Sequence, residues 1–299
     1  MKYGYIGLGN LGGHLAASLV RAGFDLTVYD KNPALAERHL ALGAHWADSP
    51  TQLAREVDVV LTCLPSPVVS AMVLQELIAA GKSGLHWLEM STLGRDEIQA
   101  LAEQAQAGGI QVLESPVTGG VHLAAQGKIT VIVGGEQSLF EQHRPALEAM
   151  GDQIFYMGAL GSAAIIKVIT NMLAFIHLVA DGEALMLAKR GGLDLAQAWA
   201  VIKASSGNSF VHETEGQLIL NGSYDIAFTM DLALKDLGFA LNFGREFEVP
   251  LDLAGLTQQT FVKGKAAYGG QAQSTQIVKL LEDVLQTDLR APGFPSRLE

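Results

Sequence analysis

The first half of the chain alternates short apolar runs with longer segments of helical periodicity. The runs span three to seven residues and are rich in β-branched and aromatic side chains, as buried strands are. The segments between them repeat apolar residues at the spacing of an amphipathic helix. Strands at Tyr3–Ile6, Leu26–Tyr29, Val57–Cys63, Leu85–Met90, Gln111–Leu113, Ile129–Val133 and Ile154–Tyr156 are predicted, with helices at Leu11–Arg21, Val68–Ala79, Asp96–Ala107 and Ser138–Met150. This alternation predicts a doubly wound α/β fold with a parallel sheet.

The pattern changes after Gly158, where strand signals fade and apolar residues recur at helical spacing. The second half therefore predicts an all-helical domain. Its first helix, roughly Ser162–Lys189, is apolar on most faces and has to be buried, between the two halves or against another subunit. We divide the chain into an α/β domain at residues 1–160 and a helical domain at residues 161–299.

Composition and charge narrow the class of protein. The chain has 299 residues, of which 49% are hydrophobic and 17% charged, so it can bury a sizeable core. The formal net charge of −11 argues against nucleic acid or an anionic membrane as a partner, because either requires a basic surface. The eight histidines are scattered without the spacing of metal ligands, so we expect no metal site.

The single cysteine, Cys63, excludes a disulfide within the chain and fits a reducing compartment. The N-terminal residues lack the apolar stretch of a signal peptide. The most apolar segment, Ile165–Ala180, is too short and too polar to span a bilayer. We therefore expect a cytoplasmic protein without a membrane segment.

A glycine-rich loop joins the first predicted strand to the first predicted helix and reads Gly7-Leu8-Gly9-Asn10-Leu11-Gly12. Gly7 permits a tight turn, Gly9 lets a pyrophosphate approach the backbone, and Gly12 lets helix and strand pack closely. Phosphates would then face N–H groups at the start of a helix. In this context the loop predicts a Rossmann-type dinucleotide site in the first domain.

Asp30 supports this interpretation. It ends the second predicted strand, 23 residues after Gly7, where a carboxylate accepts hydrogen bonds from the adenosine ribose. Its charge repels a 2′-phosphate and favours NAD over NADP. The neighbouring Lys31 can soften that preference, so NADP is not excluded.

Four ordered motifs resemble the β-hydroxyacid dehydrogenases, which include 3-hydroxyisobutyrate dehydrogenase and tartronate semialdehyde reductase. The motifs are the opening IGLGNLGGHLAASLVRAGF with its following YDKNP, then SPVTGGVHLAAQGKITVIVGG at 115–135, GSAAIIKVITN at 161–171 and FTMDLALKDLGFAL at 228–241. The resemblance covers nearly the whole chain. It implies a Rossmann domain, a helical domain for substrate binding and oligomerisation, and an active site in the cleft between them.

The resemblance also assigns site residues. The family's catalytic lysine falls on Lys167 and its substrate-orienting asparagine on Asn171. The loop that binds the substrate carboxylate falls on Thr118, Gly119 and Gly120, and His122 lies in the same loop. Lys235 is expected near nicotinamide and substrate, and further cofactor contacts are implied for Asp236, Leu64, Pro65 and Thr92.

The residue types at 167 and 171 suit hydride chemistry. Lys167 and Asn171 are four residues apart on a predicted helix and project from one face. Reduction of a carbonyl places negative charge on its oxygen, and a lysine ammonium can supply the proton. Taken alone, Lys167 also fits a lysine whose stem packs at the helix edge while its head reaches solvent.

Three positions depart from the family pattern. Thr118 stands where serine is usual, Thr170 replaces an asparagine, and Leu123 replaces a glycine of the substrate loop. These changes leave the hydride chemistry intact and alter the pocket, so we expect a small hydroxy acid other than 3-hydroxyisobutyrate.

Two alternatives remain at this stage. The glycine loop alone fits a non-catalytic dinucleotide-binding interaction module, and the architecture alone fits an imine reductase. Both generally lack the lysine, so Lys167 favours an NAD(P)-dependent dehydrogenase that interconverts a hydroxy acid and its semialdehyde or keto form. The apolar helical half predicts a homodimer or homotetramer.

Overall fold

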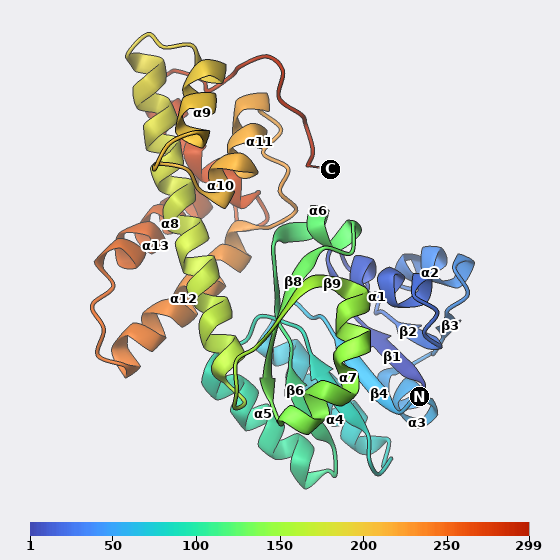
Figure 1. The fold of residues 1–299 in the computed structure, drawn as a ribbon. Coiled ribbons are helices and arrows are strands. Elements are labelled where there is room, and N and C mark those ends of the chain that lie inside the picture. The colour runs from blue at the N-terminus through green and yellow to red at the C-terminus, as the bar shows by residue number, and fades with distance from the viewer. Residues whose placement is uncertain (299) are drawn as a thin grey trace. The chain divides into compact units, whose positions relative to one another are not determined.

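The computed structural model describes residues 1–298 and divides them into two compact units, Met1–Lys167 and a second that begins at Val168 (Figure 1). The division falls within helix α8 (Ser162–Arg190), which begins in the first unit and continues through the second. Each unit has its own core.

The first unit contains a mainly parallel sheet with the strand order β3-β2-β1-β4-β5-β6-β8-β7, and β9 pairs with β8. All pairs from β3 to β6 are parallel, β8 runs antiparallel to β6 and β7, and β9 runs parallel to β8. The strands are β1 (Tyr3–Ile6), β2 (Leu26–Tyr29), β3 (His45–Trp46), β4 (Val59–Thr62), β5 (His86–Glu89), β6 (Gln111–Glu114), β7 (Val117–Thr118), β8 (Ile129–Gly135) and β9 (Gly151–Tyr156). The predicted Rossmann-type fold is confirmed, and its order reverses between β1 and β4, where such sheets open a crevice for ligands.

Helices cover both faces of this sheet (Figure 1). Alternate residues of the central strands point to opposite faces: Tyr5, Leu61 and Leu88 join one apolar cluster, and Ile6, Val60 and Trp87 the other. The first cluster includes residues of α1 (Gly12–Arg21), α6 (Gly120–Ala125) and α7 (Gln137–Met150), and the second includes residues of α3 (Pro50–Glu56), α4 (Pro67–Ala79) and α5 (Arg95–Ala107). A short 3₁₀ turn (Pro33–Ala36) and α2 (Glu37–Ala41) follow β2.

The second unit is helical throughout its described residues, apart from one isolated bridge between Thr229 and Gln273. It consists of most of α8 with α9 (Leu195–Lys203), α10 (Phe210–Glu213), α11 (Glu215–Asn221), α12 (Met230–Glu246), α13 (Asp252–Tyr268), a 3₁₀ turn (Ser274–Val278) and α14 (Lys279–Leu285). Phe175, Leu178 and Leu185 of α8 pack in its core with Leu237 of α12 and Phe261 of α13. The predicted helical domain is therefore confirmed.

Helix α8 corrects one argument drawn from the sequence. The segment Ile165–Ala180 is too short to span a bilayer, but α8 has 29 residues and is long and apolar enough by length and composition alone. A core helix of a soluble protein meets the same criterion. Its length therefore does not decide whether α8 spans a membrane. In this structure Phe175 and Leu178 of α8 pack in the helical core.

A pair of histidines, His143 buried and His86 half-buried, lies at the amino ends of the strands, opposite the ligand edge. His86 Nδ1 is 2.8 Å from His143 Nε2, and the Tyr3 hydroxyl is 3.4 Å from His143 Nδ1. His143 has no exposed surface, and burial together with the neighbouring His86 lowers its pKa to about 4. Burial also lowers the pKa of His86.

This pair predicts a loss of stability in mild acid. An unfolded histidine has a pKa of about 6.5, so the unfolded chain binds a proton at this position below that pH. In the folded protein His143 binds the proton only near pH 4. The contribution is complete above about pH 6.5 and is lost as the pH falls, by up to about 1.4 kcal/mol per pH unit. Urea unfolding at several pH values should show a shallower dependence for His143→Leu. His45→Leu, at a side chain 70% exposed, should keep the wild-type dependence; equal slopes in all three proteins would contradict the assignment.

Candidate active site

The glycine loop has the shape that a dinucleotide requires. Gly7 has φ of +100°, and a Cβ there would lie 2.3 Å from the carbonyl oxygen of Cys63. A Cβ on Gly12 would lie 2.1 Å from the carbonyl oxygen of Gly7, so α1 packs directly against the loop. A Cβ on Gly9, in contrast, would meet nothing within 4 Å. No side chain caps the start of α1 at Leu11, and a phosphate can therefore approach the N–H groups over Gly9.

Asp30 links this loop to the end of β2. Its Oδ2 accepts a hydrogen bond from the N–H of Leu8 at 2.7 Å, and its Oδ1 accepts one from the N–H of Asn32 at 2.8 Å. Each carboxylate oxygen can accept a second hydrogen bond, so the ribose hydroxyls can still be bound. Lys31 beside it is exposed. The residues present fit an NAD(P) cofactor.

The predicted contacts after β4 and β5 lie at the same edge of the sheet. The N–H of Leu64 donates to Ser91 Oγ at 2.8 Å, and Glu89 Oε1 accepts from the N–H of Ser91 at 2.7 Å. Pro65 and Thr92 are the next residues in these two turns. Because β1, β2, β4 and β5 are parallel, their carboxyl ends bring the predicted cofactor residues of the first unit to one edge.

The predicted substrate loop continues from β7 into α6. Thr118 ends the strand, and Gly119 and Gly120 follow with φ of +121° and +88°. A Cβ on Gly119 would lie 2.9 Å from Cδ1 of Leu123, so the leucine that replaces a family glycine packs against this turn. His122 is half-buried, and burial lowers the pKa of its ring, which is therefore neutral near pH 7.

Lys167 is buried, at 6% exposure, in the second turn of α8. It lies close enough to Cys63, at the end of β4, for its charge to oppose the burial that raises the pKa of that thiol to about 12. An exposed lysine at a helix edge would show neither feature. Asn171 follows one turn later on the same face of α8.

In the second unit Asn171 belongs to a polar cluster on α12. Its amide Nδ2 donates to Asp236 Oδ2 at 2.6 Å, and Lys235 Nζ lies 2.8 Å from Asp236 Oδ1. Asp236 is 1% exposed. An ionised carboxylate only accepts, so this contact assigns the donor end of the amide to Asp236 and turns Oδ1 the other way. The structure thus brings together Asn171, Lys235 and Asp236, and the expected cofactor contact of Asp236 stays a prediction.

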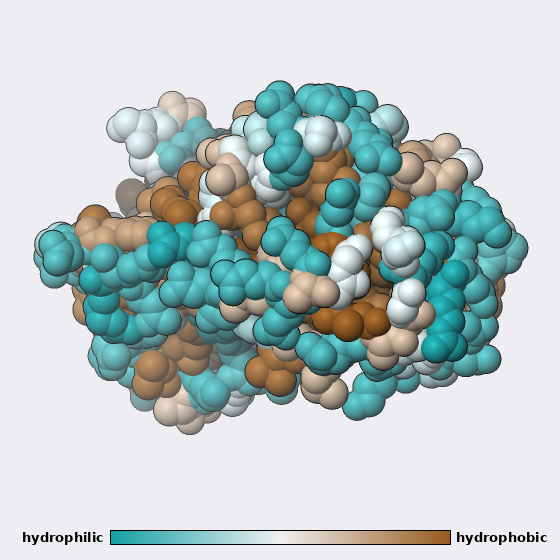
Figure 2. All heavy atoms as spheres, turned by 90° about the horizontal axis from the view of Figure 1, so that it is seen from below, coloured by the Kyte–Doolittle hydropathy of each residue, from teal (hydrophilic) through white to brown (hydrophobic). Residues whose placement is uncertain are grey.

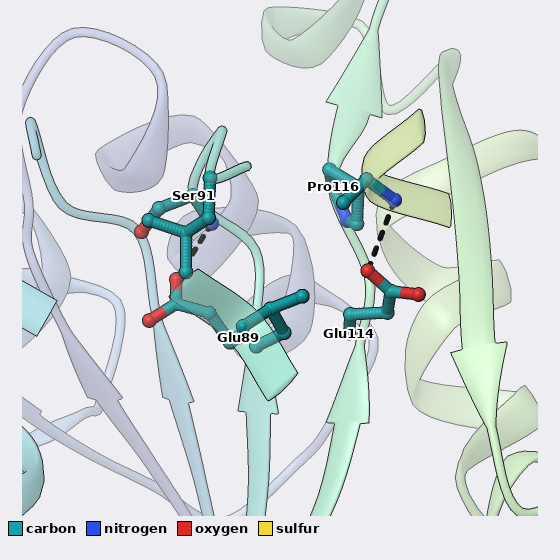
Figure 3. A pocket seen from close by; sticks show the side chains of 7 residues that line it. Glu89, Ser91, Glu114 and Pro116 are labelled. Carbon is teal, nitrogen blue, oxygen red and sulfur yellow. Dashed lines mark hydrogen bonds between the residues drawn. The ribbon is translucent and has the colours of Figure 1, made fainter. Parts of the chain in front are cut away.

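Two buried glutamates were missed by the sequence reasoning. Glu89 and Glu114 are paired in register at the ends of β5 and β6, and both line a cavity that has no room for a water molecule (Figure 3). Burial raises the pKa of Glu89, and it raises the pKa of Glu114 to about 6. The signal was present, because a carboxylate at the end of a buried parallel strand is unusual.

Among residues 1–298 no group of three His, Cys, Asp or Glu side chains is arranged to hold a metal ion.

Comparison with known proteins agrees with this geometry. Residues 2–158 match the NAD binding domain of 6-phosphogluconate dehydrogenase, and residues 161–281 match the NAD-binding domain of NADP-dependent 3-hydroxyisobutyrate dehydrogenase. Fold and site thus define an NAD(P)-dependent oxidoreductase. The chain belongs to the β-hydroxyacid dehydrogenase family.

Its relatives cover nearly the whole chain. It is 30% identical to 2-(hydroxymethyl)glutarate dehydrogenase of Eubacterium barkeri, over 95% of this chain and 96% of the relative. It is 35% identical to 3-hydroxyisobutyrate dehydrogenase of Pseudomonas aeruginosa, over 86% and 90%. The crystal structure of a Salmonella typhimurium 3-hydroxyisobutyrate dehydrogenase superposes with a TM-score of 0.88 at 29% identity, over 94% and 99%. An imine reductase of Myxococcus stipitatus, at 17% identity and a TM-score of 0.63 over 94% and 100%, shares the fold alone.

The open space at Gly9 gives a specific prediction. Gly9→Ala should fold normally, because its Cβ meets no protein atom, and should weaken NADH binding roughly tenfold, which corresponds to about 1.4 kcal/mol. Fluorescence titration with NADH measures the affinity, and thermal unfolding verifies the fold. Gly255→Ala on α13, where a Cβ also meets nothing within 4 Å, is the matched control and should bind NADH like wild type. Unchanged affinity in Gly9→Ala would place the pyrophosphate elsewhere.

Proposed function

We propose that this enzyme interconverts a small hydroxy acid and its semialdehyde or keto form, with Lys167 as the general acid and base. The observation that carries the proposal is the burial of Lys167 on α8, beside the end of β4 and one turn before Asn171. Buried lysines are rare unless the charge is used or paired. The position is the one where the family resemblance places the catalytic lysine.

The reaction divides between cofactor and protein. When bound, NAD(P)H supplies a hydride to the carbonyl carbon and becomes NAD(P)⁺. The Lys167 ammonium donates a proton to the carbonyl oxygen, so that one hydride and one proton give the alcohol. In the oxidising direction the neutral amine of Lys167 takes the hydroxyl proton. Asn171 donates one of its two amide N–H groups to Asp236, and the second N–H is assigned to the reacting oxygen of the substrate, which it helps to orient.

The substrate carboxylate is assigned to the turn at Thr118, Gly119 and Gly120. Successive backbone N–H groups and one hydroxyl form an anion-sized nest without a fixed positive charge. His122 is neutral near pH 7, because burial lowers its pKa, and so it offers a hydrogen bond and no countercharge. This favours a substrate with one carboxylate here and a neutral group near His122.

NAD is proposed as the preferred cofactor. The Asp30 carboxylate, held by two backbone N–H groups at the end of β2, would repel a 2′-phosphate. Exposed Lys31 next to it would permit slower use of NADP. A cytoplasmic location is proposed with this function, since the single cysteine, Cys63, is a partly buried thiol with no second cysteine in the chain to form a disulfide.

The decisive measurement follows nicotinamide absorbance with NAD⁺ and NADP⁺ against short 2- and 3-hydroxy acids. Wild type should turn over at least one of them, faster with NAD⁺. Lys167→Ala should lower kcat roughly 10²- to 10⁴-fold, the usual contribution of a general acid or base, while NADH binding is retained. Lys189→Ala, near the other end of α8, is the control and should keep full activity. NADH binding without turnover of any acid would support a non-catalytic binding protein instead.

We also propose that the protein is a homodimer or homotetramer. The second unit exposes several large apolar side chains, namely Leu173, Leu187, Val201, Leu253, Leu256, Val262 and Val284. Apolar patches also interrupt the polar surface in the space-filling view (Figure 2). Exposed apolar surface of this kind is typical of subunit interfaces.

The oligomer is tested by light scattering of the purified protein. A mass of two or four times that of the chain is expected, and a monomeric mass at micromolar concentration would contradict the proposal. Leu256→Lys on α13, at a residue 66% exposed, should lower the mass without unfolding the chain if this surface forms the interface.

A further inference from the structure

The start of α8 is capped by a side chain from a distant strand. Glu114, at the end of β6, accepts hydrogen bonds on Oε1 from the N–H groups of Gly161 at 2.5 Å and Ala163 at 2.9 Å, and on Oε2 from the N–H of Ala164 at 2.9 Å. The first four N–H groups of a helix lack partners within it, and a local Ser, Thr, Asp or Asn usually supplies one acceptor. Here one carboxylate, 47 to 50 residues earlier in the chain, serves three of them. Figure 3 shows one of these hydrogen bonds as the dashed line at Glu114.

The Glu114 carboxylate is closely packed by the neighbouring elements. A Cβ on Gly134 of β8 would lie 2.2 Å from Glu114 Oε1, so glycine is required beside the carboxylate. Gln99 of α5 donates to the carbonyl oxygen of Leu160 at 3.2 Å and fixes the chain just before the helix. Glu114 itself is 2% exposed. Glu114 thus joins the first turn of α8 to the end of β6 by hydrogen bonds, beside the apolar packing of Ala164.

Two opposing effects act on the negative charge of Glu114: the helix N-terminus stabilises it, and burial destabilises it. A carboxylate at a helix N-terminus is stabilised by the helix dipole, but burial raises the pKa of Glu114 to about 6 against the effect of the three N–H groups. Two other ionisable groups lie on neighbouring elements, Glu89 paired in register on β5 and Arg95 of α5 beside Gly161, and Lys167 follows on α8 itself. Glu114 is therefore anionic above about pH 6 and becomes protonated below it.

We propose that Glu114 is a positioning residue for Lys167: its carboxylate fixes the first turn of α8 to the end of β6 and so sets where the lysine amine lies at the carboxyl edge of the sheet. This inference rests on the proposed role of Lys167. Lys167 is three residues after Ala164, which is about 4.5 Å further along the helix axis. A displacement of about 1 Å at a reacting group can lower a rate roughly 10²-fold.

The test compares Glu114→Gln, Glu114→Asp and wild type. Glutamine has the same size but only one acceptor atom, so its amide nitrogen would face a backbone N–H. At saturating substrate and pH 8, kcat of Glu114→Gln should fall tenfold or more, while KM for the cofactor is unchanged. Glu114→Asp keeps the charge and should recover part of kcat. Thermal unfolding verifies that each variant folds, and a loss of stability with unchanged kcat would overturn the proposal.

The pH profile separates positioning from a purely structural role. In the reducing direction, where Lys167 acts as the ammonium, wild-type kcat should decrease below about pH 6 as Glu114 takes up a proton and loses an acceptor. This decrease should be absent in Glu114→Gln and present in Glu114→Asp. Glu89→Gln removes the neighbouring carboxylate but none of the contacts to α8. Its kcat should still decrease below about pH 6, even if its kcat at pH 8 differs from that of wild type. A decrease that persists in Glu114→Gln would assign it to another group.

A second readout needs no substrate and separates this inference from the proposed function. Competitive acetylation at pH 8, followed by mass spectrometry, measures the reactivity of each lysine amine. Loss of the three hydrogen bonds to the first turn of α8 should expose the amine of Lys167 and speed its acetylation at least threefold in Glu114→Gln, with Lys189 unchanged as the internal reference. An unchanged Lys167 rate would overturn the positioning role. A changed rate in a protein that turns over no hydroxy acid would count against the proposed function alone.

Discussion

A helix that begins inside a protein needs acceptors for the N–H groups of its first turn. In α8 these acceptors are the two oxygens of Glu114, which extend from the end of β6 to Gly161, Ala163 and Ala164. The same helix carries Lys167 and Asn171, and the same sheet carries the glycine loop. In the proposed role, this buried carboxylate helps to set where Lys167 lies in the first unit, and burial raises its pKa to about 6, the direction expected when a charge is taken out of water.

The carboxyl ends of parallel strands converge, and this explains why residues far apart in the sequence form one site. The glycine loop follows β1, Asp30 follows β2, and Leu64 follows β4. Hydrogen bonds then join neighbouring ends: Glu89 accepts from the N–H of Ser91, and Ser91 Oγ accepts from the N–H of Leu64. Such a network fixes the turns against each other, so that a ligand at this edge meets a surface that is already ordered.

Elements that carry a hydrophobic period or a fixed glycine spacing could be predicted from the sequence. Single contacts between residues far apart in the chain could not. Periodicity and the spacing of Gly7, Gly9 and Gly12 gave the strands, the order of the domains and the dinucleotide loop. The strands β3 and β7 were missed because two residues carry no period. Glu114 was missed because its partners lie about 50 residues away, and only the folded chain brings its carboxylate to the start of α8. The contact of Asn171 with Asp236, across 65 residues, was unpredictable for the same reason.

A site that binds its ligand through backbone N–H groups tolerates more substitutions than a site that depends on one catalytic side chain. N–H groups around Gly9, Gly119 and Gly120 can bind anions whatever side chains surround them, provided that glycine keeps the backbone accessible. Neighbouring positions such as Thr118 and Leu123 can then change and reshape the pocket, which is consistent with relatives at about 30% identity that share the whole fold. Proton transfer has no such freedom, because it needs one amine at one place. Selection on this scaffold should therefore act most strongly on Lys167 and on the contacts that hold α8 in position.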